Sequence, residues 1–505
     1  MKKFLLLFVF FFTLSFAQET TKDNLTKLYI ATFDRAPDID GIEYWLESDL
    51  TLEEVAQSFF DQDETRNKYP TSLSTEDFVL AIYQNLFKRV PDTAGKEYWI
   101  GELDKGSISE SLFILAIING TQGDDALILT NKTEVGFYFM FYKLSDLIEA
   151  REVMSGITKD TATIIEAYKK IDSYAILHGT FQPLPKKTLQ TVSYDSDGNS
   201  VTDSTLKDDA FYALGTVANY ERDDTKEVVT DNVTQLMWQD DVAVTQIQKA
   251  YVTETNYDTG DYSNTAGDTA VTYCGQLALG GYSDWRLPTI DELMSLPIKG
   301  ATSSSVSIDA TFQNISSANY WTSSEIADSN DATSMIQDLD QSIWVVNFES
   351  NHDDWINKSD NRPLIRCVRS LGDTTTRTFT RDDSGVVKDN KSGLYWQDKY
   401  TSSIPNMSWE FAIDYCESLS LGSYDDWRLP NFNELYSIAD RTKYNPSINT
   451  NAFLEVIPHH YWSSTTIEDK RDHAWSVNFY YGYGGSGDWQ IKSETNRVRC
   501  VRSPH

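Results

Sequence analysis

Trp285-Arg286-Leu287-Pro288-Thr289, followed by Glu292-Leu293, recurs as Trp427-Arg428-Leu429-Pro430-Asn431, followed by Glu434-Leu435. The recurrence continues on both sides of this element and keeps its order, which chance does not produce. Tyr-Trp pairs at 320–321 and 461–462 and Asn-Phe pairs at 347–348 and 478–479 also match. We therefore predict two homologous domains in tandem, over residues 221–371 and 375–505.

Both kinds of secondary structure are expected inside each copy. Residues 343–348 and 474–479 alternate apolar and polar side chains, which is typical of half-buried strands. Residues 409–419 have helical spacing that ends near a cysteine. The fold class is therefore multidomain, with two tandem α+β domains in the C-terminal half.

This half resembles the C-terminal domain of the Legionella collagen-like adhesin, a family also catalogued as domain of unknown function 1566. The Trp-Arg-Leu-Pro element carries the resemblance, which spans residues 221–370 and 380–503. It implies a C-type-lectin-like fold and an adhesin that binds glycosaminoglycans. Formylglycine-generating enzymes share that broad fold, but they hold copper with a closely placed cysteine pair, and here the cysteines lie at the two ends of each copy.

The four cysteines are placed two to a copy, Cys274 with Cys367 and Cys416 with Cys500. Four cysteines allow three connectivities. Only pairing within a copy closes each repeated unit, and C-type-lectin-like folds also join a first-helix cysteine to one in the last strand. We predict two disulfides, and catalytic or metal-binding cysteines are the alternative.

A second internal repeat lies in residues 18–180, which we predict to be an all-α domain. Leu28-Tyr29…Phe33-Asp34-Arg35-Ala36-Pro37-Asp38…Gly41…Tyr44-Trp45 recurs as Ile82-Tyr83…Phe87-Lys88-Arg89-Val90-Pro91-Asp92…Gly95…Tyr98-Trp99. Proline ends a helix in each copy, and Asp38 and Asp92 are expected to cap the next one. The two repeats span residues 24–70 and 78–125, and further helices follow.

This pattern resembles domain of unknown function 4214, a helical family with similarity to phycobilisome linker repeats and with no established chemistry. The spacing predicts that four aromatic side chains belong to the core, with a ligand platform as the alternative: Tyr44, Trp45, Tyr98 and Trp99.

Residues 1–17 are predicted to be a signal peptide. Lys2 and Lys3 precede the apolar stretch Phe4 to Leu14, and small residues stand before Gln18. No later stretch approaches ~20 apolar residues, so no transmembrane segment is expected after cleavage. We expect an exported protein, extracellular or at the cell surface, with the periplasm as the alternative. Residues 181–220 are expected to be a linker with a small hairpin.

Composition excludes some partners. Hydrophobic residues make up 40% and aromatic residues 13%, enough for packed cores, whereas the formal net charge of −33 repels phosphate backbones. Nucleic acid is therefore not expected as a partner. Polysaccharides or glycoconjugates are expected, together with other cell-envelope components.

Sugar-binding sites combine aromatic faces with fixed carboxylate and amide hydrogen-bonding groups. The glycine-rich stretch 480–489 and its counterpart 349–355 supply such side chains, in loops between strands. The candidate ligand-binding residues are Tyr480, Tyr481, Tyr483, Asp488, Trp489, Asp354 and Trp355. The alternative is that these residues lie on the surface of a hairpin and bind no ligand.

We predict no catalytic residues, no enzymatic activity and no cofactor. The adjacent pair His459-His460 is not shared by the two copies, and neighbours on a strand point to opposite faces. Calcium binding stays an alternative, because the aspartate pairs 223–224 and 382–383 could supply oxygen ligands. Against it, Phe follows Asn347 and Asn478, where calcium-dependent lectins carry Asp. The predicted function is glycan or surface recognition by an adhesin-like protein. A structural envelope or matrix component is the alternative, and an enzyme on a formylglycine-generating-enzyme-like scaffold ranks lower.

Overall fold

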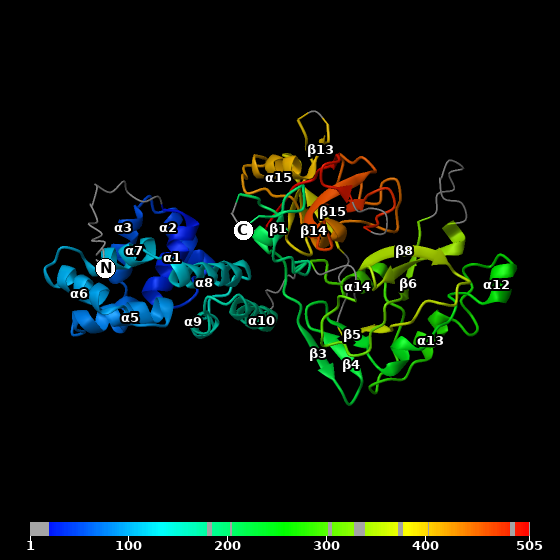
Figure 1. Ribbon diagram of the computed structural model, residues 1–505, viewed down its shortest axis with the longest axis horizontal. Helices are drawn as coiled ribbons and strands as arrows, with labels where there is room; N and C mark the ends of the chain where they lie inside the picture. The colour runs from blue at the N-terminus through cyan, green and yellow to red at the C-terminus, as the bar shows by residue number, and fades with distance from the viewer. Residues whose placement is uncertain are drawn as a thin grey trace, which may run out of the picture. The chain divides into compact units, whose positions relative to one another are not determined.

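The computed structural model describes residues 20–178, 184–201, 205–300, 306–327, 339–371, 377–401, 403–484 and 490–503. The predicted signal peptide therefore lies outside the described residues. The chain divides into two compact units, residues 1–181 and residues 182–505, and each is described by itself (Figure 1). The first unit is all-α and the second contains the two tandem α+β repeats, so the predicted fold class is confirmed.

The helical unit consists, in its described residues, of α1 (Lys22–Phe33), α2 (Ile39–Leu46), α3 (Leu52–Phe60), α4 (Asp63–Lys68), α5 (Thr75–Phe87), α6 (Thr93–Asp104), α7 (Glu110–Asn119), α8 (Gly123–Phe141), α9 (Leu147–Ser155) and α10 (Ala162–Leu177). No single described helix is long and apolar enough to cross a membrane, and α7 with α8 passes that test only as a pair bent by 105°.

The Arg-x-Pro-Asp turns separate the helices as expected. Helices α1 and α5 each end at a residue in the left-handed region, Asp34 (φ 56°) and Lys88 (φ 55°). The carboxylate of Asp38 then accepts the N–H of Gly41 at 2.8 Å, and Asp92 caps α6 in the same way at 2.8 Å. Both predicted N-caps are confirmed, and they stabilise helix starts by satisfying otherwise unpaired N–H groups.

The second unit begins with the segment expected to be a linker. It contains the predicted hairpin, β1 (Ser193–Tyr194) paired with β2 (Ser200–Val201), and the short helix α11 (Asp209–Tyr212). This segment packs on the second repeat: Gln190 Oε1 accepts the N–H of Thr466 at 2.7 Å, and the hydroxyl of Thr465 donates to Asp209 at 2.6 Å.

Each repeat contains a four-stranded sheet that brings its two ends together. In the first repeat its order is β3 (Tyr220–Asp223), β4 (Val228–Asp231), β5 (Leu236–Gln239) and β9 (Val368–Ser370). In the second repeat it is β10 (Phe379–Arg381), β11 (Val386–Asp389), β12 (Tyr395–Gln397) and β18 (Val501–Arg502). Neighbouring strands in both sheets are antiparallel, so the last strand of each repeat pairs with an early one.

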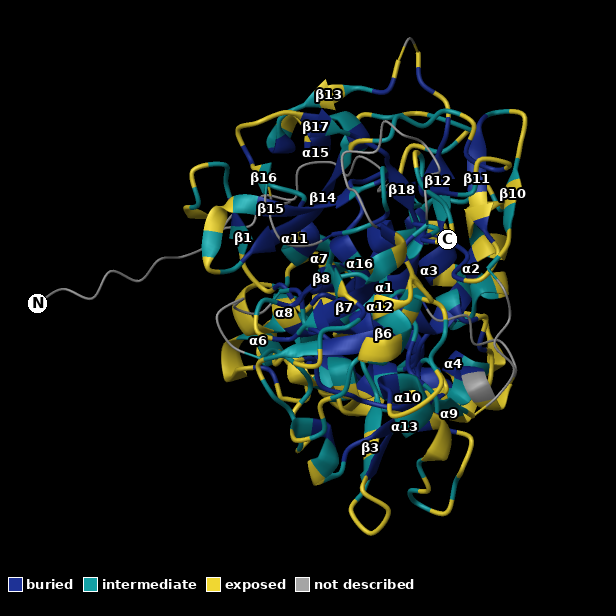
Figure 2. Ribbon diagram, turned by 90° about the vertical axis from the view of Figure 1, so that its right-hand side faces the viewer, coloured by how far each residue is buried: buried dark blue, intermediate teal, exposed yellow. Residues whose placement is uncertain are grey.

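A second sheet carries the predicted ligand loops. In the first repeat it has the order β6 (Asn319–Glu325), β7 (Ser342–Asn347) and β8 (His352–Asn357). In the second repeat β14 (His460–Ile467), β15 (Lys470–Asn478) and β16 (Gln490–Ile491) correspond to these strands, with β13 (Asn406–Met407) and β17 (Asn496–Arg497) added at one edge. Strands β7 and β14 are largely buried, shown dark blue in Figure 2.

Short helices complete the repeats. They are η1 (Val242–Thr245), α12 (Glu254–Asp258), α13 (Ala270–Gln276), α14 (Ile290–Met294) and η2 (Leu339–Gln341) in the first repeat, and α15 (Trp409–Glu417) and α16 (Phe432–Ser437) in the second. Helices α14 and α16 follow the Trp-Arg-Leu-Pro elements and begin with capping boxes. Each repeat has its own core of buried aromatic and aliphatic side chains around its disulfide.

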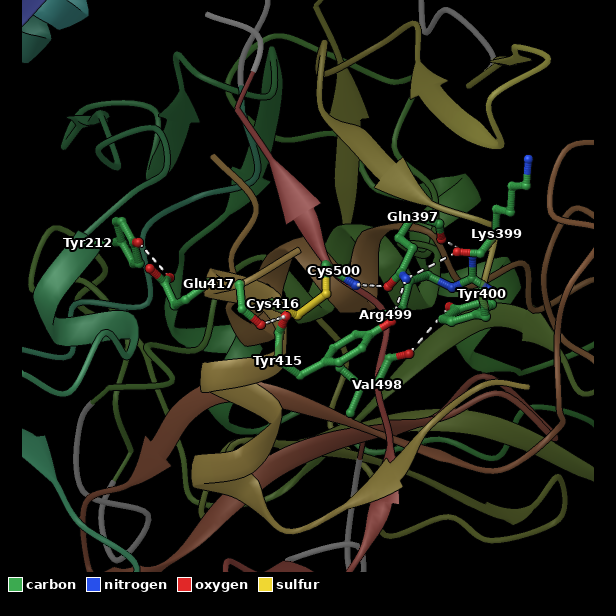
Figure 3. The surroundings of a disulfide bond; sticks show 11 residues. Tyr212, Gln397, Lys399, Tyr400, Tyr415, Cys416, Glu417, Val498, Arg499 and Cys500 are labelled. Atoms are coloured by element: carbon green, nitrogen blue, oxygen red, sulfur yellow. Dashed lines mark hydrogen bonds between the residues drawn. A yellow bond between two sulfur atoms is a disulfide. The ribbon is translucent and has the colours of Figure 1, made fainter. Parts of the chain in front are cut away.

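The disulfides Cys274–Cys367 and Cys416–Cys500 form within the repeats, as predicted. Around the second one, the amide of Gln397 accepts the N–H of Cys500 at 3.3 Å and donates to the hydroxyl of Tyr415 at 2.7 Å (Figure 3). Each disulfide thus joins a helix, α13 or α15, to the residue directly before the last strand of its repeat, β9 or β18. Since that strand pairs with β5 or β12, the disulfide closes the repeat.

Candidate functional site

The structure brings together described residues of the two stretches predicted as ligand loops, but the prediction of a loop was wrong for Asp354 and Trp355, which lie on a strand. Strand β8 of the first repeat carries Asp354 and Trp355, and the turn after β15 of the second repeat carries Tyr480, Tyr481 and Tyr483. All five side chains are half-buried. We call Trp344, Trp355, Tyr480, Tyr481 and Tyr483 the junction aromatics.

Ring contacts connect the junction aromatics across the two repeats. The ring centroid of Trp355 lies 5.5 Å from that of Tyr483 and 6.3 Å from that of Tyr481. Trp344, fully buried on β7, lies beneath Trp355 at 5.4 Å in an edge-on arrangement. Edge-to-face pairs of this kind stabilise aromatic clusters beyond simple burial. The partly exposed rings are therefore held in place by a buried one.

A buried carboxylate anchors the turn that carries the tyrosines. Asp353, next to Asp354 on β8, accepts the hydroxyl of Tyr436 at 2.7 Å and the N–H of Gly484 at 3.0 Å. Tyr436 lies on α16 and Gly484 directly follows Tyr483, so both partners belong to the second repeat. A buried carboxylate is costly unless it is hydrogen-bonded, and here the second repeat supplies the donors.

Two buried cations also join the repeats. The ammonium of Lys299 lies 4.6 Å from the ring centre of Phe432 and 4.5 Å from that of Trp475, and it donates to the carbonyl of Asn351. Burial lowers the pKa of Lys299 to about 7. Arg441 stacks on Tyr436 at 3.7 Å and pairs with Asp291 of the first repeat.

The exposed rim of the cluster includes a perturbed carboxylate. Asp354 accepts the N–H of Trp355 at 2.8 Å, and burial raises the pKa of its carboxyl. A carboxylate oxygen beside half-exposed aromatic faces matches the side-chain types used in sugar recognition. Asp488 and Trp489 lie outside the described residues.

A family model described as the Lcl C-terminal domain matches residues 227–369 and again 385–502, which together make up over half of the chain. The chain belongs to the Lcl C-terminal domain family. The two matches coincide with the two repeats, and the family is that of an adhesin-like surface protein. A model for domain of unknown function 4214 matches residues 56–121 of the helical unit. Among curated proteins, no match was found.

The arginines of the Trp-Arg-Leu-Pro elements play a structural part in the two Lcl C-terminal domains. Arg428 donates to both oxygens of Glu434 at 2.8 and 2.6 Å, and Arg286 binds Glu292 at the same two distances. Both arginines therefore anchor a carboxylate of their own repeat. The glutamates are also the capping-box residues of α14 and α16, so each pair fixes the start of a helix.

The other charged candidates have local structural partners in the Lcl C-terminal domains. Asp223 accepts backbone N–H groups of its own turn, and Asp382 does the same in the second domain. The ring of His460 contacts the hydroxyl of Ser476 and the amide of Asn478, and burial lowers its pKa to about 4. Within the described ranges, no group of three or more His, Cys, Asp or Glu side chains could hold a metal ion.

Sequence reasoning missed the residues that join the Lcl C-terminal domains: Asp353, Tyr436, Lys299 and Arg441. One signal was available. Lys299 and Arg441 stand at the same position relative to the capping-box glutamates Glu292 and Glu434, so both copies carry a cation there. Nothing comparable marks Tyr436, whose counterpart in the first copy is Met294.

The core prediction for the helical unit was wrong for two residues. Tyr44 is 66% exposed and Tyr98 49% exposed, whereas Trp45 and Trp99 are half-buried against Phe59 and Phe113. The error has a geometric cause: adjacent residues on a helix point about 100° apart, so only one side chain of each Tyr-Trp pair can face the core.

Proposed function

We propose that this chain is an exported, non-catalytic surface protein that recognises glycans, and that the junction aromatics with Asp354 form its ligand surface. The observation that carries the proposal is the meeting of strand β8 of the first repeat with the turn after β15 of the second, each with half-buried aromatic rings. Membership of an adhesin-like family and two disulfides agree with a protein outside the cytoplasm.

Preorganisation supports this assignment. The rings of Trp355, Tyr481 and Tyr483 are already packed on one another, and Trp344 is fully buried beneath Trp355. A ligand that stacks on them therefore need not immobilise free side chains, a cost of about 0.5–1.5 kcal/mol for each side chain ordered on binding. Asp354 adds an acceptor for sugar hydroxyl groups.

The cysteines support a role without catalysis. All four are used in the two disulfides, and no free cysteine remains. A thiol nucleophile, or a closely placed cysteine pair of the kind that holds copper, would need at least one reduced cysteine. Binding to other envelope components through the same surface belongs to the same proposal.

A structural envelope or matrix component is the second candidate, and one observation favours it. The junction aromatics contact one another across the repeats, so they contribute to joining the two domains even without a ligand. Under this alternative, substitutions at the junction lower stability but affect no glycan interaction.

The decisive experiment is a glycan and polysaccharide array probed with the full chain, with calcium and with a chelator. Trp355→Ala and Tyr481→Ala are each expected to weaken binding about three- to tenfold, the equivalent of one aromatic contact. Phe411→Ala is the matched control, since Phe411 is an aromatic side chain of the second repeat that is 68% exposed and outside the junction.

Four outcomes are informative. Binding lost in the junction variants and kept in the control supports the proposed site. Binding unchanged in all variants refutes the site, and an array without any bound glycan from oxidised, folded protein favours the structural role. Loss of signal on chelation would assign calcium a part in recognition.

A further inference from the structure

Each copy of the helical repeat contains an exposed tyrosine that does not belong to the core, Tyr44 in the first copy and Tyr98 in the second. Several other residues of the pattern have internal partners in both copies. Arg35 stacks over Tyr29 at 5.4 Å, and Arg89 over Tyr83 at 5.2 Å. The aspartates after the prolines cap the following helices, and the glycines supply the capped N–H groups.

The tryptophan beside each tyrosine packs on a buried phenylalanine. The ring centroid of Trp45 lies 5.4 Å from that of Phe59. In the second copy, the ring centroid of Trp99 lies 5.2 Å from that of Phe113. Both indole rings are therefore fixed parts of the scaffold.

Each tyrosine lies edge-on against its fixed tryptophan. The ring centroids are 4.9 Å apart in Tyr44–Trp45, with an interplanar angle of 83°, and 4.9 Å apart in Tyr98–Trp99, with an angle of 69°. The same arrangement thus occurs twice, with about half or more of each tyrosine exposed. An exposed ring that packs on a fixed neighbour loses little conformational entropy when a ligand binds to it.

The surroundings of the rings indicate which ligand they fit. An exposed glutamate precedes each tyrosine, Glu43 in the first copy and Glu97 in the second. In the first copy, Asp40 on α2 and Glu47 directly after this helix are also exposed. Carboxylates accept hydrogen bonds from sugar hydroxyl groups and repel anionic polymers. Protein interfaces are depleted of charged residues at their apolar centre, whereas these rings have carboxylates beside them.

We propose that Tyr44 with Glu43 and Tyr98 with Glu97 form two equivalent binding platforms for a neutral polysaccharide. Two platforms on one compact unit match a repeating ligand, because a polymer that engages both gains affinity through effective concentration. This surface lies in the helical unit and is independent of the junction aromatics.

The test is co-sedimentation of the full, oxidised chain with insoluble cellulose and chitin, with soluble alginate as the acidic competitor. The chain is studied both unchanged and with Trp355→Ala and Tyr481→Ala together, which removes the junction surface. In both backgrounds we expect binding to at least one neutral polymer, a loss of at least about tenfold on Tyr44→Ala with Tyr98→Ala, and a smaller loss for either change alone.

Matched variants separate the ring from the fold. Tyr44→Phe with Tyr98→Phe keeps the aromatic faces and should retain most binding, and Leu127→Ala removes an apolar side chain of the same unit that is 52% exposed. Thermal unfolding should be unchanged by the substitutions at Tyr44, Tyr98 and Leu127, each compared within the same background, because exposed side chains contribute little to stability.

Several results would overturn the proposal. They are no binding to either neutral polymer by the unchanged chain, equal binding after the double alanine change, or competition by alginate. A change of oligomeric state on Tyr44→Ala with Tyr98→Ala would instead assign these rings to self-association. If the junction variants bind these polymers normally while the tyrosine variants do not, the tyrosine platforms are supported, and the junction assignment is decided by the glycan array alone.

Discussion

Equivalent arginine–glutamate pairs occur in the two repeats, but they are buried to different extents. The donor–acceptor distances are 2.8 and 2.6 Å in both copies. In the second repeat, however, the side chains of Arg428 and Glu434 are 4% and 0% exposed, whereas those of Arg286 and Glu292 are 40% and 16% exposed. The pair of the first repeat is therefore a control for the pair of the second, with burial as the main variable.

The perturbation is Glu434→Gln compared with Glu292→Gln. Glutamine can still serve in a capping box, so each change mainly removes the charge and leaves the helix start intact. Removing one partner of a buried ion pair costs about 3–5 kcal/mol because the other charge stays buried and uncompensated. For a partly exposed pair the cost is about 0.2–1 kcal/mol. The loss in the free energy of unfolding should therefore be several-fold larger for Glu434→Gln in the second repeat than for Glu292→Gln in the first.

Hydrogen exchange measured by mass spectrometry is the appropriate assay, since global unfolding of a chain with several domains is not two-state. Peptides covering α16 and α14 report on the two repeats separately, with both disulfides kept oxidised. A loss of protection confined to the second repeat in Glu434→Gln, with little change in Glu292→Gln, is the expected result. Equal losses in the two variants would refute the argument that burial determines the cost.

Three further predictions concern the second unit. Replacing Cys416 and Cys500 by Ala should cost about 2–5 kcal/mol in the free energy of unfolding, seen as an earlier thermal transition in the same buffer. Burial raises the pKa of Asp209 to about 7, so this carboxyl is protonated in the folded state over a pH range in which it is ionised in the unfolded state. The free energy of unfolding should therefore fall as pH rises from about 4 to 7 and then level off. Asp209→Asn should flatten this dependence, and at pH 8 the variant should unfold at a higher temperature than the wild type. Tyr436→Phe removes one hydrogen bond to Asp353 and should cost about 1.5–3 kcal/mol, measurable as faster hydrogen exchange in β8.

The fold was largely predictable because each element occurs twice. Two copies of the same order of residues revealed the domains, and two cysteines in each copy indicated the disulfides. The exposed tyrosines of the helical repeats were not predicted, since a Tyr-Trp pair does not reveal which ring faces the core. Only the packing of Trp45 on Phe59 and of Trp99 on Phe113 decides that.

The junction could not be predicted for a different reason. Internal repeats reveal what the copies share, whereas the contacts between the copies depend on residues in which they differ. Tyr436, which binds Asp353, corresponds to Met294 in the first copy, and the aromatic turn that carries Tyr481 has an acidic counterpart. Long-range contacts of this kind leave no periodicity in the sequence.

The asymmetry of the junction bears on why the repeat is duplicated. Lys299 and Arg441 occupy equivalent positions, yet both stack on rings of the second repeat, Lys299 on Phe432 and Trp475 and Arg441 on Tyr436. At the Lys299 contact the first repeat contributes the basic side chain and the second contributes the rings, so this contact joins unlike surfaces of the two repeats. The junction aromatics are likewise drawn from both repeats. If they bind the ligand, the tandem pair presents one composite surface rather than two separate ones, and the expected stoichiometry there is one ligand site per chain.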